Sequence, residues 1–142
     1  MAQVLVMDVM QPVQQLCPSC PTPTLIRAYI DAARRFCNFT RWLRVRIPGS
    51  TAANTRTYNL GSDPYVEICG IIAAEITDPA TDTHPLTERM SGDWNPNQEN
   101  GVPEQYQYLP EGEFALHPIP DGIYAMTVGC ILQPKRSAVS LD

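Results

Sequence analysis

The sequence predicts an α+β fold in which one main amphipathic helix packs on an antiparallel β-meander or sandwich. Two patterns predict this fold: residues 24–37 carry apolar side chains at helical spacing, and several later segments alternate apolar and polar side chains. The 14 prolines in 142 residues favour short strands and stiff turns over further long helices. We therefore expect an extended, proline-rich N-terminal arm over 1–23, a single domain over 24–142, and a short C-terminal tail.

The main helix is expected over 24–37, with Thr24 as its N-cap. One face of the helical period carries four apolar side chains: Leu25, Tyr29, Ala32 and Phe36. Four neighbours widen this stripe: Ile26, Ile30, Ala33 and Cys37. Such a wide apolar surface is typical of a helix that packs on two sides.

Six segments have the pattern of strands, namely 42–47, 55–60, 64–77, 104–109, 113–117 and 123–132. In the first, Leu43, Val45 and Ile47 share one face, and Trp42, Arg44 and Arg46 share the other. Gly70 is expected to mark a bulge. Short turns join the last three segments, which predicts an antiparallel meander. Residues 78–101 are expected to form a long loop with one helical turn at 85–91.

The arm and this loop are expected to dock partners. Four prolines disfavour a helix in the arm: Pro12, Pro18, Pro21 and Pro23. The run Val4 to Met7 is apolar and could add a strand to a neighbouring sheet. The docking candidates are Val4, Leu5 and Val6 in the arm, and Trp94 in the loop.

Charge is distributed unevenly along the chain, whose formal net charge is −5. Six of the 10 basic residues lie within 27–46, beside the single acid Asp31, whereas 63–121 holds 12 acids and one base. This separation is typical either of self-association or docking between unlike surfaces, or of a chance clustering of solvated charges. One lysine and an acidic balance are unlike the footprint of a DNA-binding domain. The arginine cluster suits contact with an acidic protein neighbour or with DNA that passes by it. The candidate contact residues are Arg34, Arg35, Arg41, Arg44 and Arg46.

Recognisable catalytic or metal-binding motifs are lacking. Cys17 and Cys20 form a CxxC, but a structural zinc site needs four ligands, and the other candidates stand alone: Cys37, Cys69, Cys130, His84 and His117. Phosphate-binding glycine loops, nucleophile elbows and HExxH motifs do not occur. We expect reduced thiols, no cofactor, no metal and no membrane segment. A small zinc or thiol enzyme that uses Cys17 and Cys20 is a less favoured alternative.

Two stretches resemble a known family. The first is Thr24 to Cys37, followed by Thr40, Arg41 and Trp42; the second runs from Pro103 to Tyr106 and from Glu113 to Pro120, and continues with Tyr124 and Leu132. Both resemble the adaptor, or head-to-tail connector, proteins of short-tailed bacteriophages. These adaptors usually continue after the meander into a C-terminal helical segment. For this chain we expect only a short tail at that position.

The resemblance implies a non-enzymatic structural protein of the virion. It implies a ring of identical subunits, dodecameric in this family, that docks on the portal, extends the DNA channel and offers an attachment surface to the tail nozzle. DNA would pass through the channel without sequence-specific contacts. The ring would lie at the head–tail interface and assemble in the host cytoplasm. A tail-fibre or receptor-binding module, associating as a trimer, is the alternative within the same virion.

Overall fold

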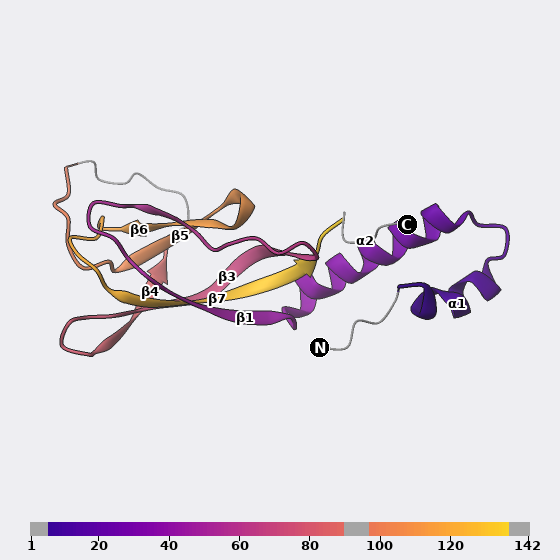
Figure 1. Ribbon diagram of the computed structural model, residues 1–142, viewed down its shortest axis with the longest axis horizontal. Helices are drawn as coiled ribbons and strands as arrows, with labels where there is room; N and C mark the ends of the chain where they lie inside the picture. The colour runs from indigo at the N-terminus through magenta and orange to yellow at the C-terminus, as the bar shows by residue number, and fades with distance from the viewer. Residues whose placement is uncertain (1–5, 90–96, 137–142) are drawn as a thin grey trace.

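The computed structural model describes residues 6–89 and 97–136, with the side chains of 6–10 left out. Its elements are α1 (Val6–Leu16), α2 (Thr22–Thr40), β1 (Arg44–Ser50), β2 (Thr57–Asn59), β3 (Val66–Thr77), β4 (Thr83–Glu88), β5 (Gln105–Leu109), the 3-10 turn η1 (Pro110–Gly112), β6 (Glu113–His117) and β7 (Ala125–Pro134). The described strands form one seven-stranded sheet that curls into a half-barrel, and the two helices project from one end of it (Figure 1). The predicted α+β fold class is confirmed.

The strand order is β1-β7-β3-β4-β5-β6-β2, so the last strand of the chain lies between the first and the third. The predicted hairpin of β5 and β6 is confirmed, but β7 leaves the meander and pairs antiparallel with β1 and β3. Its run of buried residues suits an interior strand rather than an edge. A register shift between Ile68 and Gly70 confirms the predicted bulge.

The hydrophobic core lies inside the curl of the sheet. Phe114, Leu116 and Ile76 are each 0% exposed and come from β6 and β3. Tyr58 of β2 packs its ring on Phe114 at 5.6 Å between centroids. Phe114 and Leu116 share one face of β6, but Ala115 and His117 between and after them are buried as well, so β6 does not show the predicted alternation of buried and exposed residues.

The prediction of an extended arm over 1–23 is wrong for the described residues, because α1 occupies Val6–Leu16 with Pro12 inside it. A proline in a helix interior costs about 3 kcal/mol, since it removes one hydrogen bond and crowds the preceding turn. The remaining residues of α1 are rich in the strong helix formers Met, Gln and Leu, and α1 lies against α2 (Figure 1). These gains offset the cost.

The helix predicted over 24–37 is longer at both ends. It begins at Thr22, with Pro21 rather than Thr24 at its N-cap, and continues to Thr40. Pro23, at the second helical position, fits the first turn because its missing N–H would have no partner there. In the described parts of the chain, neither helix combines the length and apolar character needed to cross a bilayer.

The predicted loop over 78–101 contains a strand, β4. The prediction of a helical turn at 85–91 is wrong for residues 85–88, because these residues belong to β4. β4 pairs antiparallel with β3 through Thr83 to Leu86, and parallel with β5 through Thr87 and Glu88. The sheet is therefore mixed rather than wholly antiparallel. Pro85 does not disrupt it, because β5 begins to pair only after Pro85 and the other side of the strand is open there.

Replacing Phe114 with alanine should destabilise the fold by about 3–5 kcal/mol, because the large side chain is fully buried and its loss leaves a cavity. Ile123, which is 78% exposed, provides the control: Ile123→Ala should change stability by about 0.5 kcal/mol or less. Denaturant unfolding followed by circular dichroism measures both. Equal losses in the two variants would contradict a core centred on Phe114.

Candidate interaction surfaces

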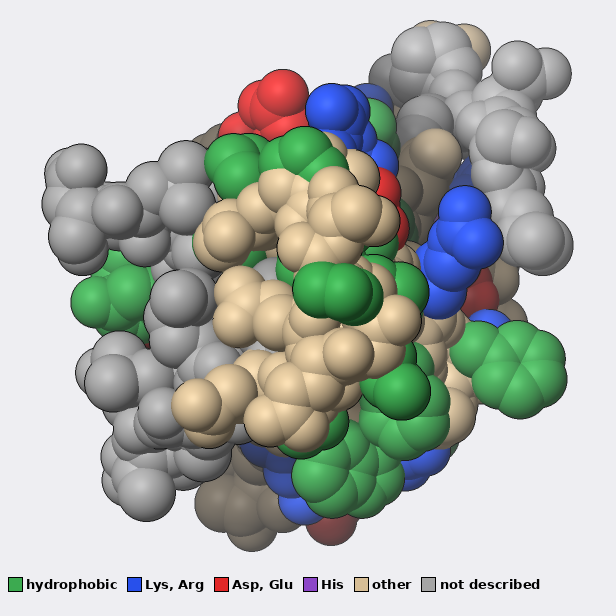
Figure 2. Space-filling view, turned by 90° about the vertical axis from the view of Figure 1, so that its right-hand side faces the viewer, with side chains coloured by type: hydrophobic (Ala, Val, Ile, Leu, Met, Phe, Trp, Pro, Cys, Tyr) green, Lys and Arg blue, Asp and Glu red, His purple; other side chains and the backbone are tan. Residues whose placement is uncertain are grey.

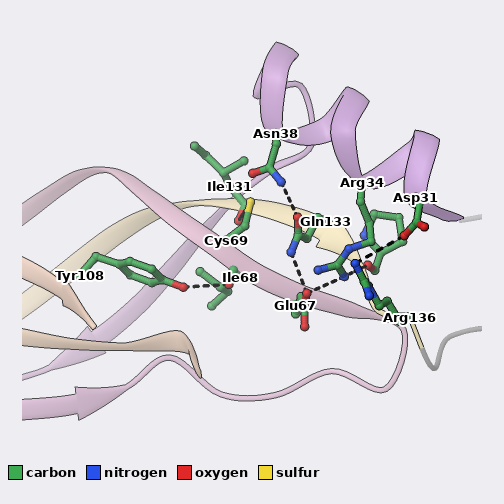
Figure 3. A network of polar contacts seen from close by, with 11 residues as sticks. Asp31, Arg34, Asn38, Glu67, Ile68, Cys69, Tyr108, Ile131, Gln133 and Arg136 are labelled. Carbon is green, nitrogen blue, oxygen red and sulfur yellow. Dashed lines mark hydrogen bonds and ion pairs between the residues drawn. The ribbon is translucent and has the colours of Figure 1, made fainter. Parts of the chain in front are cut away.

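Helix α2 meets the sheet through a set of polar side chains at the end of β7. Arg34 Nη1 pairs with Glu67 Oε1 at 2.6 Å and donates a hydrogen bond to the carbonyl oxygen of Pro134 at 2.7 Å. Asn38 donates to Gln133 at 2.6 Å, and Gln133 donates in turn to Glu67 at 2.7 Å (Figure 3). We call Arg34, Asn38, Glu67 and Gln133 the polar joint. It links α2 to both β3 and β7.

The charge of Glu67 depends on this joint. Burial acts to raise the pKa of its carboxyl, but hydrogen bonds from Arg34 and Gln133, with the positive charges of Arg34 and Lys135, outweigh it and lower the pKa below 4.5. Glu67 therefore stays ionised and paired with Arg34. Outside the joint, Arg136 adds an exposed pair with Asp31 at 3.6 Å.

The end of α2 directs the chain sharply into β1. Arg41 adopts the left-handed conformation at φ 51° and donates its N–H to the carbonyl oxygen of Cys37 at 2.9 Å, which caps the helix. The hydroxyl of Thr40 donates to the Phe36 carbonyl and accepts the N–H of Trp42. These bonds fix Trp42 just beyond the helix end.

Three aromatic side chains around this end are exposed: Phe36 by 55%, Phe39 by 91% and Trp42 by 75%. Phe36 and Trp42 meet edge to face at 6.5 Å, and we call the three the aromatic knob. Viewed from the helical end, hydrophobic side chains lie at the surface beside basic ones (Figure 2). Large apolar groups of this kind, gathered at a surface, mark sites of protein contact.

The sequence placed Phe36 and Tyr29 with Leu25 on the main apolar face, and this grouping is only partly correct. The residues of α2 that are buried are Leu25, Ile26, Ile30 and Cys37. Phe36 and Tyr29 lie on the side that faces solvent. The width of the apolar stripe, which indicated packing on two sides, was the signal for this second surface.

Four of the five arginines singled out in the sequence are exposed along the α2–β1 junction: Arg35, Arg41, Arg44 and Arg46. We call them the arginine strip. Arg44 donates through Nε to the carbonyl oxygen of Arg41, and Arg46 approaches Glu75 at 3.3 Å while remaining 73% exposed. The fifth, Arg34, is 19% exposed and turned inward to the polar joint.

Of the four docking candidates, Val4, Leu5 and Trp94 lie outside the described residues. Val6 is the first residue of α1, and Met7 follows it in the helix. The expectation of a strand over Val4 to Met7 is therefore wrong at its described end, since these two residues are helical.

A groove of about 800 Å³ opens at the helical end of the curled sheet. Its apolar lining includes Val45, Ile47, Leu60, Val66, Ile68, Tyr108 and Leu132. Leu132 shares a face of β7 with the buried Val128 and Cys130, so the groove is the open end of the hydrophobic core. Three carboxylates, Asp63, Glu67 and Glu111, and one ammonium group, Lys135, also line it.

The cysteines are free and dispersed. Cys17 and Cys20 form the turn between α1 and α2, where the Cys20 N–H donates to the Cys17 carbonyl oxygen at 3.1 Å. Burial raises the pKa of the Cys130 thiol to about 11, which keeps it protonated. Within residues 6–89 and 97–136, no three His, Cys, Asp or Glu side chains gather closely enough to hold a metal ion.

A helix pair projects from the curled sheet, and aromatic and basic groups of the kind that mark sites of protein contact are exposed where the pair joins it. Comparison of the sequence with family models identifies the class as the bacteriophage head-to-tail adaptors. The matching model is described as SU10 adaptor protein and covers residues 6–142, so the chain belongs to this family. Among curated proteins, none matches the chain. The resemblance to phage adaptors is confirmed.

The polar joint predicts a pH-dependent contribution to stability. Because the pKa of Glu67 is lowered in the folded state, its pairing stabilises the fold above about pH 4.5 and is lost as the pH falls through the folded value. Glu67→Gln should reduce stability at neutral pH by on the order of 1 kcal/mol or less, since the pair is partly exposed.

The measurement is urea unfolding of the wild-type chain and the Glu67→Gln variant between pH 7 and pH 3. The difference between them should shrink below about pH 4.5. Asp63→Asn is the matched control for losing a nearby carboxylate. A difference that persists unchanged at low pH would exclude ionised Glu67 as its source.

Proposed function

We propose that the chain is the repeating subunit of a ring at the head-to-tail junction of a phage particle, dodecameric as in related adaptors. The ring docks on the portal, extends the DNA channel and offers its other side to the tail nozzle. Membership of the adaptor family supports the head-to-tail role. The single structural observation that carries the assembly proposal is the exposure of the aromatic knob beside the arginine strip.

Exposure of this surface has an energetic cost in an isolated subunit. Burial of apolar surface contributes about 25 cal/mol per Å² removed from water, and large aromatic side chains dominate the energy of protein interfaces. Phe39 and Trp42 leave most of their surface in water in the single chain. Association that covers them stabilises the complex without any change of fold.

The charges of the chain support contact between unlike surfaces. The arginine strip is positive, whereas the segment from Asp63 to Asp121 carries most of the acids. A head-to-tail contact between copies brings the two signs together, and contacts of this heterologous kind close into rings. Like-charge contact between two arginine strips is disfavoured.

A DNA channel needs a wall that does not hold the DNA tightly. With a formal net charge of −5 and one lysine, the subunit offers few of the phosphate contacts that bind DNA non-specifically. Arginines of the strip that are not used between copies are available to line the channel. In this function the chain acts without catalysis, cofactor or metal, and it assembles in the host cytoplasm before it joins the virion.

Charge reversal in the strip tests the assembly proposal. The Arg44→Glu/Arg46→Glu double variant should keep its circular dichroism spectrum, because both side chains are exposed, and should associate at least tenfold more weakly. Light scattering and native mass spectrometry measure the assembly, both alone and with the portal protein of the same phage. Arg27→Glu, at an exposed position of α2 outside the strip, is the control.

Wild-type assembly should also weaken as salt is raised, since exposed charges are screened over about 10 Å at 0.1 M. Assembly of the double variant at wild-type strength in both low and high salt would refute the electrostatic contact. A stable trimer that ignores the portal would instead favour a tail-fibre module.

A further inference from the structure

We propose that the aromatic knob of one copy docks into the groove of the next copy, with the arginine strip facing the carboxylates at the groove rim. This inference rests on the proposed assembly of copies and names the two surfaces that meet. The occupant of the groove is thus a second copy of this chain.

The knob has the properties of an interface anchor. Phe39 is 91% exposed and Trp42 is 75% exposed, and both are held on a capped helix end rather than a long loop. Aromatic side chains held in this way lose little conformational freedom on binding, and they dominate binding energy when they fill a pocket. Within the described chain, no element covers them.

The groove has the properties of a receiving site. Its volume of about 800 Å³ lies in the range of ligand pockets in proteins, and its wall combines apolar residues at the open end of the core with polar and charged side chains. Ile47, Leu60 and Tyr108 pack on the core from this wall and remain partly exposed. An inserted aromatic ring would extend the same hydrophobic contacts.

The charges of the two surfaces are also complementary. Arg35 and Arg41 are chain neighbours of the knob residues Phe36 and Trp42, and Arg44 hydrogen-bonds to Arg41. Asp63, Glu67 and Glu111 line the groove, together with Lys135. Because Arg34 already neutralises Glu67, docking places a surface with three positive charges against one with a net charge of −1. A basic segment from another protein would share this charge, but only a copy of this chain is shown to carry the matching aromatic groups.

The two surfaces face different directions on one subunit. Strand alternation places Arg44 on the opposite face of β1 from Val45, which lines the groove. On α2, Phe39 lies about 100° and Phe36 about 160° around the helix from Asn38, which also borders the groove. A copy therefore cannot insert its own knob, and each copy has one knob and one groove to offer.

This geometry makes a complementation experiment decisive. Phe39→Asp removes the knob and repels the acidic groove; Ser62→Arg, at an exposed loop position lining the groove, places a positive charge against the incoming strip. Each variant alone should associate roughly 10–30-fold more weakly than wild type. Mixed together, the two should form a discrete heterodimer, because one intact knob and one intact groove remain.

Mass photometry and native mass spectrometry measure which oligomers form, with and without the portal protein of the same phage. Val45→Lys is a second groove variant, and Ile123→Asp, at an exposed apolar position remote from both surfaces, is the control that should assemble normally. The inference is overturned if Phe39→Asp and the groove variants associate as strongly as the wild-type chain. It is also overturned if the mixture of Phe39→Asp and Ser62→Arg yields no heterodimer.

A photo-crosslinking amino acid at Phe39 identifies the contact directly. Crosslinks from Phe39 to the groove of another copy support the inference, and crosslinks only to the portal, to another protein or to the same copy overturn it. Binding of the chain to the portal is scored separately. Portal binding without knob-in-groove contact leaves the proposed function standing, whereas a chain that ignores the portal overturns that function regardless of the crosslink.

Discussion

The polar joint determines how the rest of the molecule is presented. By pairing Arg34 with Glu67 and Asn38 with Gln133, it fixes the C-terminal half of α2 to the end of β7 and lets the helix project beyond the sheet (Figures 1 and 3). A helix laid flat on an apolar sheet would bury its whole stripe. Here only one side of the stripe is buried, so the aromatic knob remains outside. Hydrogen bonds and ion pairs are directional, and they specify this orientation more sharply than apolar contact alone would.

The sequence predicts local features of the fold well and long-range ones poorly. The main helix, the strand with Val45 and Ile47 on one face, the bulge at Gly70 and the hairpin of β5 and β6 follow from side-chain periodicity within each segment. The position of β7 between β1 and β3 does not, because pairing between distant strands depends on burial that periodicity does not encode.

Proline misled the prediction in two places. Pro12 lies inside α1, where good helix formers and contact with α2 offset its cost. Pro85 lies in β4 at a point where only one neighbouring strand pairs with it. In both cases a local rule gave way to tertiary context.

The proposed contact residues also differ in how far the sequence predicts their positions. Exposure of Arg44 and Arg46 follows from strand alternation with Val45 and Ile47, so it is predictable from sequence. The inward turn of Arg34 depends on Glu67, a partner distant in the chain, and is not. The open groove is likewise not predictable from the sequence, because its lining comes from β1, β3, β5, β7, helix α2 and several loops that only the fold brings together.

The edges of the sheet bear on how copies can meet. The outer edge of β1 carries two exposed arginines and Pro48, and the opposite edge strand β2 has only three residues. Charged residues, proline and short length all discourage pairing between sheet edges. In the proposed assembly, contact between copies would then depend on side chains, and a contact between two different surfaces would run in one direction around a ring. Such a ring has two unlike sides, which is what a junction between a head and a tail requires; a two-fold contact between identical surfaces would make the sides equivalent.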